Sequence, residues 1–424
     1  MELLKNLFKG DKVVWAVFLL LCLISVLEVF SASSTLAFQT GNYTSQIIRH
    51  TGFLVGGAAL AIGVQFIPLR VFKLAPLLLL FTWICLILMQ CGLGVEKNDG
   101  IRWFKIFGVP FQPSELAKMG LIITVAIILS HFQEEKGSSR TAFKWILGCT
   151  IPTLLLIAPD NLSTALILGG IIFLMMFIGR VPFRQLGALL GIIVLAGGLF
   201  ATFLLVTPTD TLKKVPLLER RGPTWKNRLL DFSDKHQETV PPEKYDIQAN
   251  YQVGHAHIAI ASGNVIGLGP GNSKTRDNLP QAYSDFIFAI ILEELGILPA
   301  AGIIFLYVIL LIRTAKIANK CNRDFPALMA IGVALLIVMQ AFVNMMVAVG
   351  LFPVTGQPLP LISRGGTSTL INCVYIGIIL SVSRYNNIQA DKQQALAEGD
   401  IAKAERLEEL GSGLDTEPRQ GGLL

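Results

Sequence analysis

Long apolar stretches constrain this 424-residue chain more than any other feature. A helix of about 20 apolar residues is long enough to cross the hydrocarbon core of a bilayer, where a segment must satisfy its own backbone hydrogen bonds. The sequence therefore predicts an all-α integral membrane protein with ten transmembrane helices. We expect these helices near residues 13–30, 51–68, 74–93, 113–132, 142–159, 163–179, 186–206, 285–312, 325–349 and 367–383.

Composition excludes an ordinary soluble protein of this length. Hydrophobic residues make up 53% of the chain, charged residues only 15%, and the mean hydropathy is +0.60. The first stretch is too long for the core of a signal peptide, and no small-residue cleavage site follows it, so we expect it to remain as a span. The six cysteines show no CxxC spacing, which gives no indication of a disulfide framework or a metal site.

Lysine and arginine in the short loops indicate the orientation, because cytoplasmic loops carry an excess of both residues. With the N-terminus inside, fourteen of them lie in inner segments and five in outer loops, which predicts that both termini are cytoplasmic. The inner residues are Lys5, Lys9, Lys12, Arg70, Lys73, Lys136, Arg140, Lys144, Arg180, Arg184, Arg313, Lys316, Lys320 and Arg323. The outer residues are Arg49, Lys97, Arg102, Lys105 and Arg364.

In this orientation the longest soluble segment, 207–284, connects the seventh and eighth spans and faces outward. It belongs to a membrane domain that we expect to cover residues 1–385. Residues 386–424 are polar, with an Ala/Glu/Lys/Arg-rich stretch at 394–410. They are predicted to form a cytoplasmic tail containing a short helix of its own.

Ionisable residues within spans are informative because each one costs roughly 2.5–3.5 kcal/mol to insert and so requires a partner or a water-filled cavity. Glu115 and Lys118 are three residues apart at the start of the fourth span and meet on one helical face. With other charges of the outer half of the bilayer they indicate one outward-facing polar cavity for an anionic, membrane-bound substrate. Snorkelling side chains and structural ion pairs remain the alternative. The residues of this predicted cavity are Glu115, Lys118, Asp160, Asp285, Arg102 and Arg364.

Asp285 has the strongest claim to chemistry among these residues. It lies where the long segment meets the eighth predicted span, and Glu293 and Glu294 are expected two turns deeper. A carboxylate partly shielded by Phe286 and Phe288 is suited to act as a general base. A helix N-cap is the alternative, since Ser or Asp at a helix start satisfies free backbone N–H groups.

The connection between the ninth and tenth spans, 353–366, is apolar yet rich in helix breakers. Irregular backbone at membrane depth is tolerated only against protein or a cavity. Its free N–H groups, together with Ser363 and Arg364, are suited to bind phosphate, and a purely structural re-entrant turn is the alternative.

The long segment 207–284 adds the basic residues Arg228, Lys274 and Arg276. Its glycine-rich run 267–271 lacks the Gly-Lys-Ser/Thr sequence and the strand–helix frame of nucleotide-binding motifs, so we expect no nucleotide or nucleic-acid partner. His255 and His257 have no third ligand nearby, which argues against zinc.

Several motifs, in order along most of the chain, resemble those of the SEDS (shape, elongation, division and sporulation) family of membrane proteins. They include Arg102-Trp103, the sequence QPSELAK at 112–118 and Pro159-Asp160. The similarity continues through Tyr251-Gln252, LPQAYSDFIF at 279–288, EELG at 293–296, PVTG at 353–356 and LPLISRGG at 359–366.

This resemblance implies a peptidoglycan glycosyltransferase that polymerises lipid II on the outer face of the bacterial cytoplasmic (inner) membrane. In that family the aspartate of the Asp-Phe-Ile-Phe segment, here Asp285, is essential, and the membrane-embedded Glu/Lys pair is Glu115 and Lys118. The acceptor's GlcNAc 4-hydroxyl would attack C1 of MurNAc in the lipid-linked strand, releasing undecaprenyl pyrophosphate with inversion to a β-1,4 linkage.

The resemblance assigns roles to the predicted cavity. Asp285 would take the hydroxyl proton, whereas Lys118, Arg102, Arg364 and Lys274 would stabilise the departing pyrophosphate. Glu115, Asp160 and Ser363 complete the expected substrate-binding set. A divalent cation, Mg²⁺ or Mn²⁺, would assist the same step, although no ligand cluster in the sequence demands one.

The expected partners are a class B penicillin-binding protein, which cross-links the strands, and other proteins of the division machinery. The end of the first span, Ser31-Ala32-Ser33, and the short tail resemble the cell-division branch of the family, which places the protein at the septum. Three alternatives stay open: a rod-elongation polymerase, a lipid II flippase and a non-catalytic scaffold. A flippase would need polar residues across the whole membrane, whereas this sequence concentrates them in the outer half.

Overall fold

A computed structural model describes residues 8–32, 43–97, 100–106, 109–135, 137–212, 221–237, 251–279, 282–403 and 405–406. Within these residues nine helices are long and apolar enough to cross a membrane, which confirms the predicted helical membrane fold. They are α2 (Lys12–Ala32), α4 (Tyr43–Gln65), α5 and α6 with the π-helix η1 (Leu69–Phe72, Ala75–Leu88, Met89–Leu93), α7 (Pro113–His131), α8 (Arg140–Ile157), α10 (Phe183–Val206), α15 (Ile297–Asn319), α16 (Asp324–Ala348) and α17 (Thr367–Ala397). A shorter apolar helix, α9 (Leu162–Ile178), occupies the place of the sixth predicted span.

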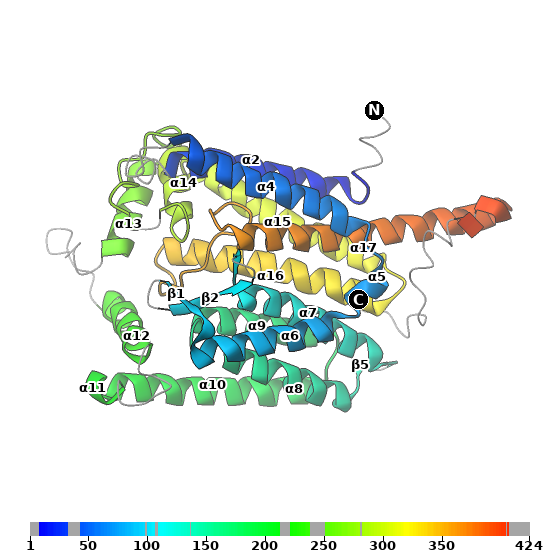
Figure 1. Cartoon of the computed structure of the whole chain (residues 1–424), viewed down its shortest axis with the longest axis horizontal. Helices are drawn as coiled ribbons and strands as arrows, with labels where there is room; N and C mark the ends of the chain where they lie inside the picture. Colours follow the sequence, from blue (N-terminus) through cyan, green and yellow to red (C-terminus); the bar gives the residue numbers. More distant parts are fainter. Residues whose placement is uncertain are drawn as a thin grey trace.

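The long helices run back and forth beside one another (Figure 1). At one end of the bundle, here called the loop end, lie β1 (Val95–Lys97), β2 (Gly100–Ile106), α11 (Thr209–Leu212), α12 (Gly222–Gln237), α13 (Tyr251–Gly263) and α14 (Ile287–Leu295). The helices α16 and α7 form the centre: 83% and 72% of the residues in their apolar membrane-spanning stretches are buried. Helix α10 lies at the edge, with 6% of that stretch buried. Polar residues at the ends of α7 and α16 are therefore carried by the most buried helices of the bundle.

The predicted continuous eighth span, 285–312, is wrong. The short helix α14 ends at Leu295, and α15 begins at Ile297. Gly296 between them adopts φ 84° and ψ −179°, a conformation that interrupts a helix and that favours glycine. The expectation that Glu293 and Glu294 lie deeper along one span fails for the same reason, since Glu294 instead contacts Ser31 in the last turn of α2.

The segment between α6 and α7 contains strands that hydropathy did not indicate. Antiparallel pairing joins β1 to β2 and β2 to β3 (Val109–Phe111), with Val95 opposite Trp103 and Phe104 opposite Phe111. A second short pair, β4 (Gln133–Glu134) and β5 (Gly137–Ser138), connects α7 to α8 at the opposite end of the bundle. Cross-strand pairs on short hairpins depend on contacts with the rest of the fold, which a local reading of hydropathy does not contain.

The last helix is longer than predicted. The helix α17 (Thr367–Ala397) continues without interruption past the apolar part and Asn386. No proline or glycine lies between Gly377 and Glu398, and the added residues include good helix formers. The predicted separate tail helix therefore begins as an extension of the final span, and residues 407–424 lie outside the described part of the chain.

Candidate functional site

Asp285 lies in a turn that leads into α14 at the loop end of the bundle. Its Oδ1 accepts a hydrogen bond from the hydroxyl of Ser284 at 3.0 Å. Residues 287–294 of α14 are all buried, so the helix anchors this turn in the protein. The N-cap position of α14 belongs to Phe286, so the interpretation of Ser284 or Asp285 as the cap is wrong.

Asn344 of α16 holds the Asp285 backbone. Its side chain is 1% exposed, and its Nδ2 donates to the carbonyl of Asp285 at 2.8 Å and to the carbonyl of Gln357 at 2.7 Å. The Gln357 amide in turn donates to the hydroxyl of Thr164 at 2.7 Å, in the first turn of α9. These buried bonds join the Asp285 turn, the 353–366 segment and two helices into one unit.

The breaker-rich segment 353–366 is fastened to the same turn. The hydroxyl of Ser363 donates to the carbonyl of Ser284 at 2.6 Å and accepts from the N–H of Leu359 at 2.7 Å. The N–H of Arg364 donates to the carbonyl of Tyr283 at 3.0 Å. The segment therefore has a structural role, as in the interpretation of it as a re-entrant turn. Phosphate binding by the segment stays a prediction.

The guanidinium of Arg364 lies 5.4 Å from the centre of the Tyr283 ring, in cation–π contact. Burial lowers its pKa from the ordinary value, the Tyr283 side chain acts in the opposite direction, and nearby Arg49 lowers it further. Tyr283 and Asp285 are two residues apart, so Arg364 brings a positive charge to the neighbourhood of the carboxylate.

The predicted pair of Glu115 and Lys118 is confirmed. Lys118 Nζ lies 2.8 Å from Glu115 Oε1, and the lysine is 1% exposed. Pro113 starts the helix, as expected for the first turn, which sets both side chains on α7 at the loop end. The hydroxyl of Tyr375 in α17 donates to the Glu115 carbonyl at 3.3 Å, which ties this turn to the last span.

Asp160 lies close to the start of α7, and its place in a substrate cavity stays a prediction. It lines a small pocket together with Gln112, Ser114 and Asn161. Asn161 caps α9 by accepting from the N–H of Thr164 at 3.2 Å, so the pocket adjoins the network that reaches Asn344. Arg102 lies in β2, but its side chain is outside the part of the chain that the structure describes.

Two arginines of the long segment interact electrostatically with each other, and one of them, Arg228, interacts with Asp285, although the predicted cavity did not include them. Arg221 directly precedes α12 and Arg228 lies in it, two helical turns further on. Burial lowers the pKa of Arg228 from the ordinary value, the charge of Arg221 lowers it further, and the charge of Asp285 raises it. Their spacing of seven residues was the available signal, because positions i and i+7 share one helical face.

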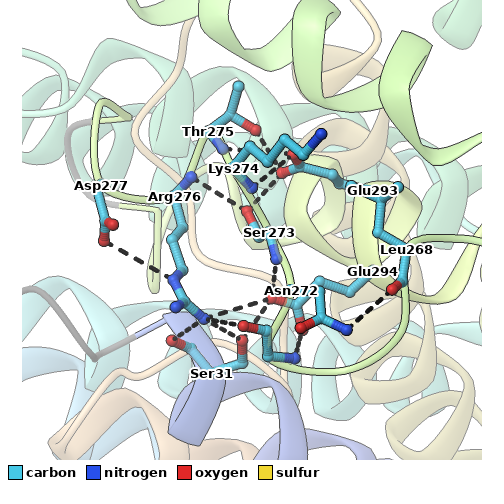
Figure 2. A network of polar contacts seen from close by, with 11 residues as sticks. Ser31, Leu268, Asn272, Ser273, Lys274, Thr275, Arg276, Asp277, Glu293 and Glu294 are labelled. Atoms are coloured by element: carbon cyan, nitrogen blue, oxygen red, sulfur yellow. Dashed lines mark hydrogen bonds and ion pairs between the residues drawn. The ribbon is translucent and has the colours of Figure 1, made fainter.

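Glu293 and Glu294 hold a loop instead of lining the site (Figure 2). Glu293 accepts from the N–H of Lys274 at 2.9 Å and from the hydroxyls of Ser273 and Thr275. Glu294 accepts from the N–H of Gly271 at 2.9 Å and from the hydroxyl of Ser31. The Lys274 side chain is exposed, so a role for it at the pyrophosphate stays a prediction.

Among the described residues no three His, Cys, Asp or Glu side chains gather in a way that could hold a metal ion. The acidic residues Glu115, Glu293 and Glu294 are engaged with lysine, hydroxyl and backbone donors. The expectation of an assisting divalent cation stays a prediction.

The sequence profile of the FtsW, RodA and SpoVE proteins, described as "Cell cycle protein", matches residues 11–388. A Pseudomonas fluorescens protein named "Probable peptidoglycan glycosyltransferase FtsW" is 30% identical over 390 residues, covering 90% of this chain and 89% of its own. A Bacillus subtilis protein of the same name is 31% identical over 383 residues, covering 88% and 91%. The similarity therefore spans the whole helical bundle.

Solved structures show the same arrangement of helices. One, described as "Structural coordination of polymerization and crosslinking by a peptidoglycan synthase complex", aligns with a TM-score of 0.64 at 26% identity, over 89% of this chain and 99% of that chain. The crystal structure of the rod shape determining protein RodA from Thermus thermophilus aligns with a TM-score of 0.60 at 25% identity, over 89% and 98%.

Proposed function

Because this chain belongs to the FtsW, RodA and SpoVE family of cell cycle proteins, we propose that it polymerises lipid II with Asp285 as the general base. It is a membrane-embedded peptidoglycan glycosyltransferase of cell division, like its FtsW relatives. The choice of lipid II and of the acting residues rests on the resemblance described above and on the arrangement of charges around Asp285.

The observation that carries this proposal is the way in which the Asp285 turn is held. A base that removes a proton in the transition state must stay within hydrogen-bond reach of the acceptor hydroxyl. Asn344 fixes the backbone of Asp285, Ser284 orients its carboxylate, and Ser363 binds the preceding carbonyl. Cationic groups lie in the same neighbourhood, on the 353–366 segment and on α12.

The proposed step is a single displacement. The 4-hydroxyl of the acceptor GlcNAc gives its proton to a carboxylate oxygen of Asp285 while its oxygen forms a bond to C1 of the donor MurNAc. The bond from C1 to the diphosphate oxygen breaks on the opposite face, and its electron pair leaves with the diphosphate. One base and one stabilised leaving group are sufficient for this inversion.

The remaining predicted residues serve binding in this proposal. Lys118 and Glu115 form a closed ion pair near the start of α7, so Lys118 acts on substrate by long-range charge or after the pair opens. Arg364 supplies positive charge beside Tyr283, and Asp160 lines the adjacent pocket. Ser363 contributes by holding the turn, since its hydroxyl is already engaged with Ser284 and Leu359.

A class B penicillin-binding protein is the proposed partner. The similar solved structure is described as a peptidoglycan synthase complex that coordinates polymerisation and crosslinking, which supports such a pairing. We place the protein in the bacterial inner membrane at the division septum, with both termini in the cytoplasm. The similarity to RodA supports one second candidate, a polymerase of rod elongation, which depletion followed by microscopy of septa and side walls would distinguish.

The test is polymerisation of purified lipid II by the full chain with its class B partner. Asp285→Asn is expected to reduce strand formation at least about 100-fold, the range that general bases contribute. Asp277→Asn is the matched control, because its side chain is 58% exposed and its ion pair with Arg276 is long, at 3.7 Å. Equal strand formation by the Asp285→Asn variant would remove Asp285 from the mechanism, and no strands from the wild type would favour a scaffold or a flippase.

A further inference from the structure

Arg221 and Arg228 form a cationic pair at the start of α12. The carbonyl of Arg221 accepts the N–H of Trp225 at 2.9 Å, so Arg221 is the residue from which the helix starts. Two turns separate the residues, which sets both side chains on the same face. The charges of Arg221 and Asp285 both act on the guanidinium of Arg228. We call Arg221 and Arg228 the α12 arginine pair.

Arg221 is unusually buried for a cationic residue. It is 9% exposed, and its Nη2 is buried without a hydrogen-bond partner among the described residues. A buried guanidinium N–H that lacks an acceptor is unfavourable, because the group has lost water and gained nothing in return. The side chain is therefore poised for an acceptor beyond the described residues, and a bound anion would supply one.

The charge balance of the α12 arginine pair points the same way. Two guanidinium groups repel each other more strongly as water is removed, and among the described residues neither is within ion-pair distance of a carboxylate. Burial and the charge of Arg221 lower the pKa of Arg228 against the opposite effect of Asp285. A bound anion would relieve both the repulsion and the missing hydrogen bond.

We propose that the α12 arginine pair binds the diphosphate of the lipid-linked donor, the leaving group of the glycosyl transfer. This inference rests on the proposed function and adds to it the residues that receive the leaving group. Guanidinium groups suit this role because their planar forks bind phosphate oxygens with two parallel hydrogen bonds.

The electrostatic interaction of Arg228 with Asp285 favours the donor diphosphate over that of the acceptor. In the donor, the diphosphate is bonded directly to C1 of MurNAc, the carbon attacked by the hydroxyl that Asp285 deprotonates. The base and the leaving group therefore act on the two faces of one carbon atom. In the acceptor, a whole MurNAc ring separates the reacting GlcNAc from its diphosphate. As the bond from C1 to oxygen breaks, the electron pair moves onto the diphosphate, where two guanidinium groups would stabilise the added negative charge.

Binding of undecaprenyl diphosphate to the full chain tests this inference without requiring turnover. The protein is reconstituted in phosphatidylcholine nanodiscs, and the dissociation constant is measured for the wild type, Arg228→Gln and Arg221→Gln. Each substitution removes a charge-assisted interaction, so each is expected to weaken binding about tenfold or more. Arg228→Lys keeps the charge but loses the fork, and is expected to bind more weakly than the wild type and more tightly than Arg228→Gln.

Lys226→Gln is the matched control, since it removes the same charge from the same helix. Lys226 donates to the carbonyl of Thr207 at 2.7 Å, and at two positions from Arg228 it lies on a different face of the helix. It is expected to bind undecaprenyl diphosphate as the wild type does. Inorganic diphosphate should compete in the wild type and compete less well in the arginine variants.

Several outcomes would overturn the inference. These are unchanged affinity in both arginine variants, equal losses in Lys226→Gln, or no saturable binding by the wild type. The same measurement in nanodiscs that contain phosphatidylglycerol gives a further outcome. If binding of undecaprenyl diphosphate is lost there and the arginine variants no longer differ from the wild type, the pair is a general contact for anionic lipids. Polymerisation by the Asp285→Asn variant would refute the proposed base and leave these binding results intact, so the two failures are distinguishable.

Discussion

Replacement of Asn344 by leucine tests how the Asp285 turn is held. The wild-type amide donates two buried hydrogen bonds, at 2.8 Å to the carbonyl of Asp285 and at 2.7 Å to the carbonyl of Gln357. Leucine has a similar size but no donor, so both carbonyls lose this partner. Hydrogen bonds between membrane helices are worth about 0.6 kcal/mol on average and at most about 1.7 kcal/mol, so the two together contribute about 1–3 kcal/mol.

This energy converts into an expected rate. If the productive conformation of the Asp285 turn loses about 1–3 kcal/mol relative to other conformations, its population and the rate of polymerisation fall by a factor of about 5 to 150. We expect the loss in kcat rather than in KM, because Asn344 touches the catalytic turn and not the diphosphate sites. The assay is lipid II polymerisation at several substrate concentrations by the full chain with its partner.

Gln340→Met is the matched control for Asn344→Leu. Gln340 lies one turn earlier on α16 and is 6% exposed, so the substitution also removes a buried amide from the same helix. It should retain most of the rate, because Gln340 is outside the bonds that hold Asp285. A wild-type kcat for folded Asn344→Leu, or a loss confined to KM, would refute this reasoning about the turn.

The other predictions concern stability and are measured by thermal unfolding in detergent. Lys118→Met leaves Glu115 without its ion-pair partner at 2.8 Å and is expected to destabilise the protein by about 3–5 kcal/mol, whereas the double change with Glu115→Gln should recover much of that loss. If the destabilisation of the double variant equals the sum of the two single effects, the expected coupling of Glu115 and Lys118 is contradicted. In Gly296→Ala, the new Cβ would lie 2.5 Å from the Val265 carbonyl oxygen at a φ of 84°, so a loss above about 1 kcal/mol is expected; Gly302→Ala on α15, with open space around it, should be neutral.

The helical fold and its approximate spans followed from the sequence alone, because transmembrane helices are specified by local hydropathy over about 20 residues. The ion pair of Glu115 and Lys118 was equally predictable, since both residues lie on one helix at a spacing that geometry fixes. Asp285 could be singled out because a continuous sequence motif carries the family resemblance. Each of these features depends on residues that are close together in the chain.

What the sequence did not reveal depends on residues far apart in the chain. Asn344 and Asp285 are 59 positions apart, and the loop residues that bind Glu293 are 18 to 20 positions from it. Hydropathy did not reveal the break at Gly296, because the segments on both sides of it are mostly apolar and the break accompanies the close approach of residues 265–267 to its backbone.

The interaction of Arg228 with Asp285 is the clearest case, since only the placement of α12 at the loop end brings these two charges together. Hydropathy and motif spacing determined which segments cross the membrane and which carboxylate to consider. The tertiary structure decided which distant donors and charges surround that carboxylate, because contacts between separate segments form only when the helices pack.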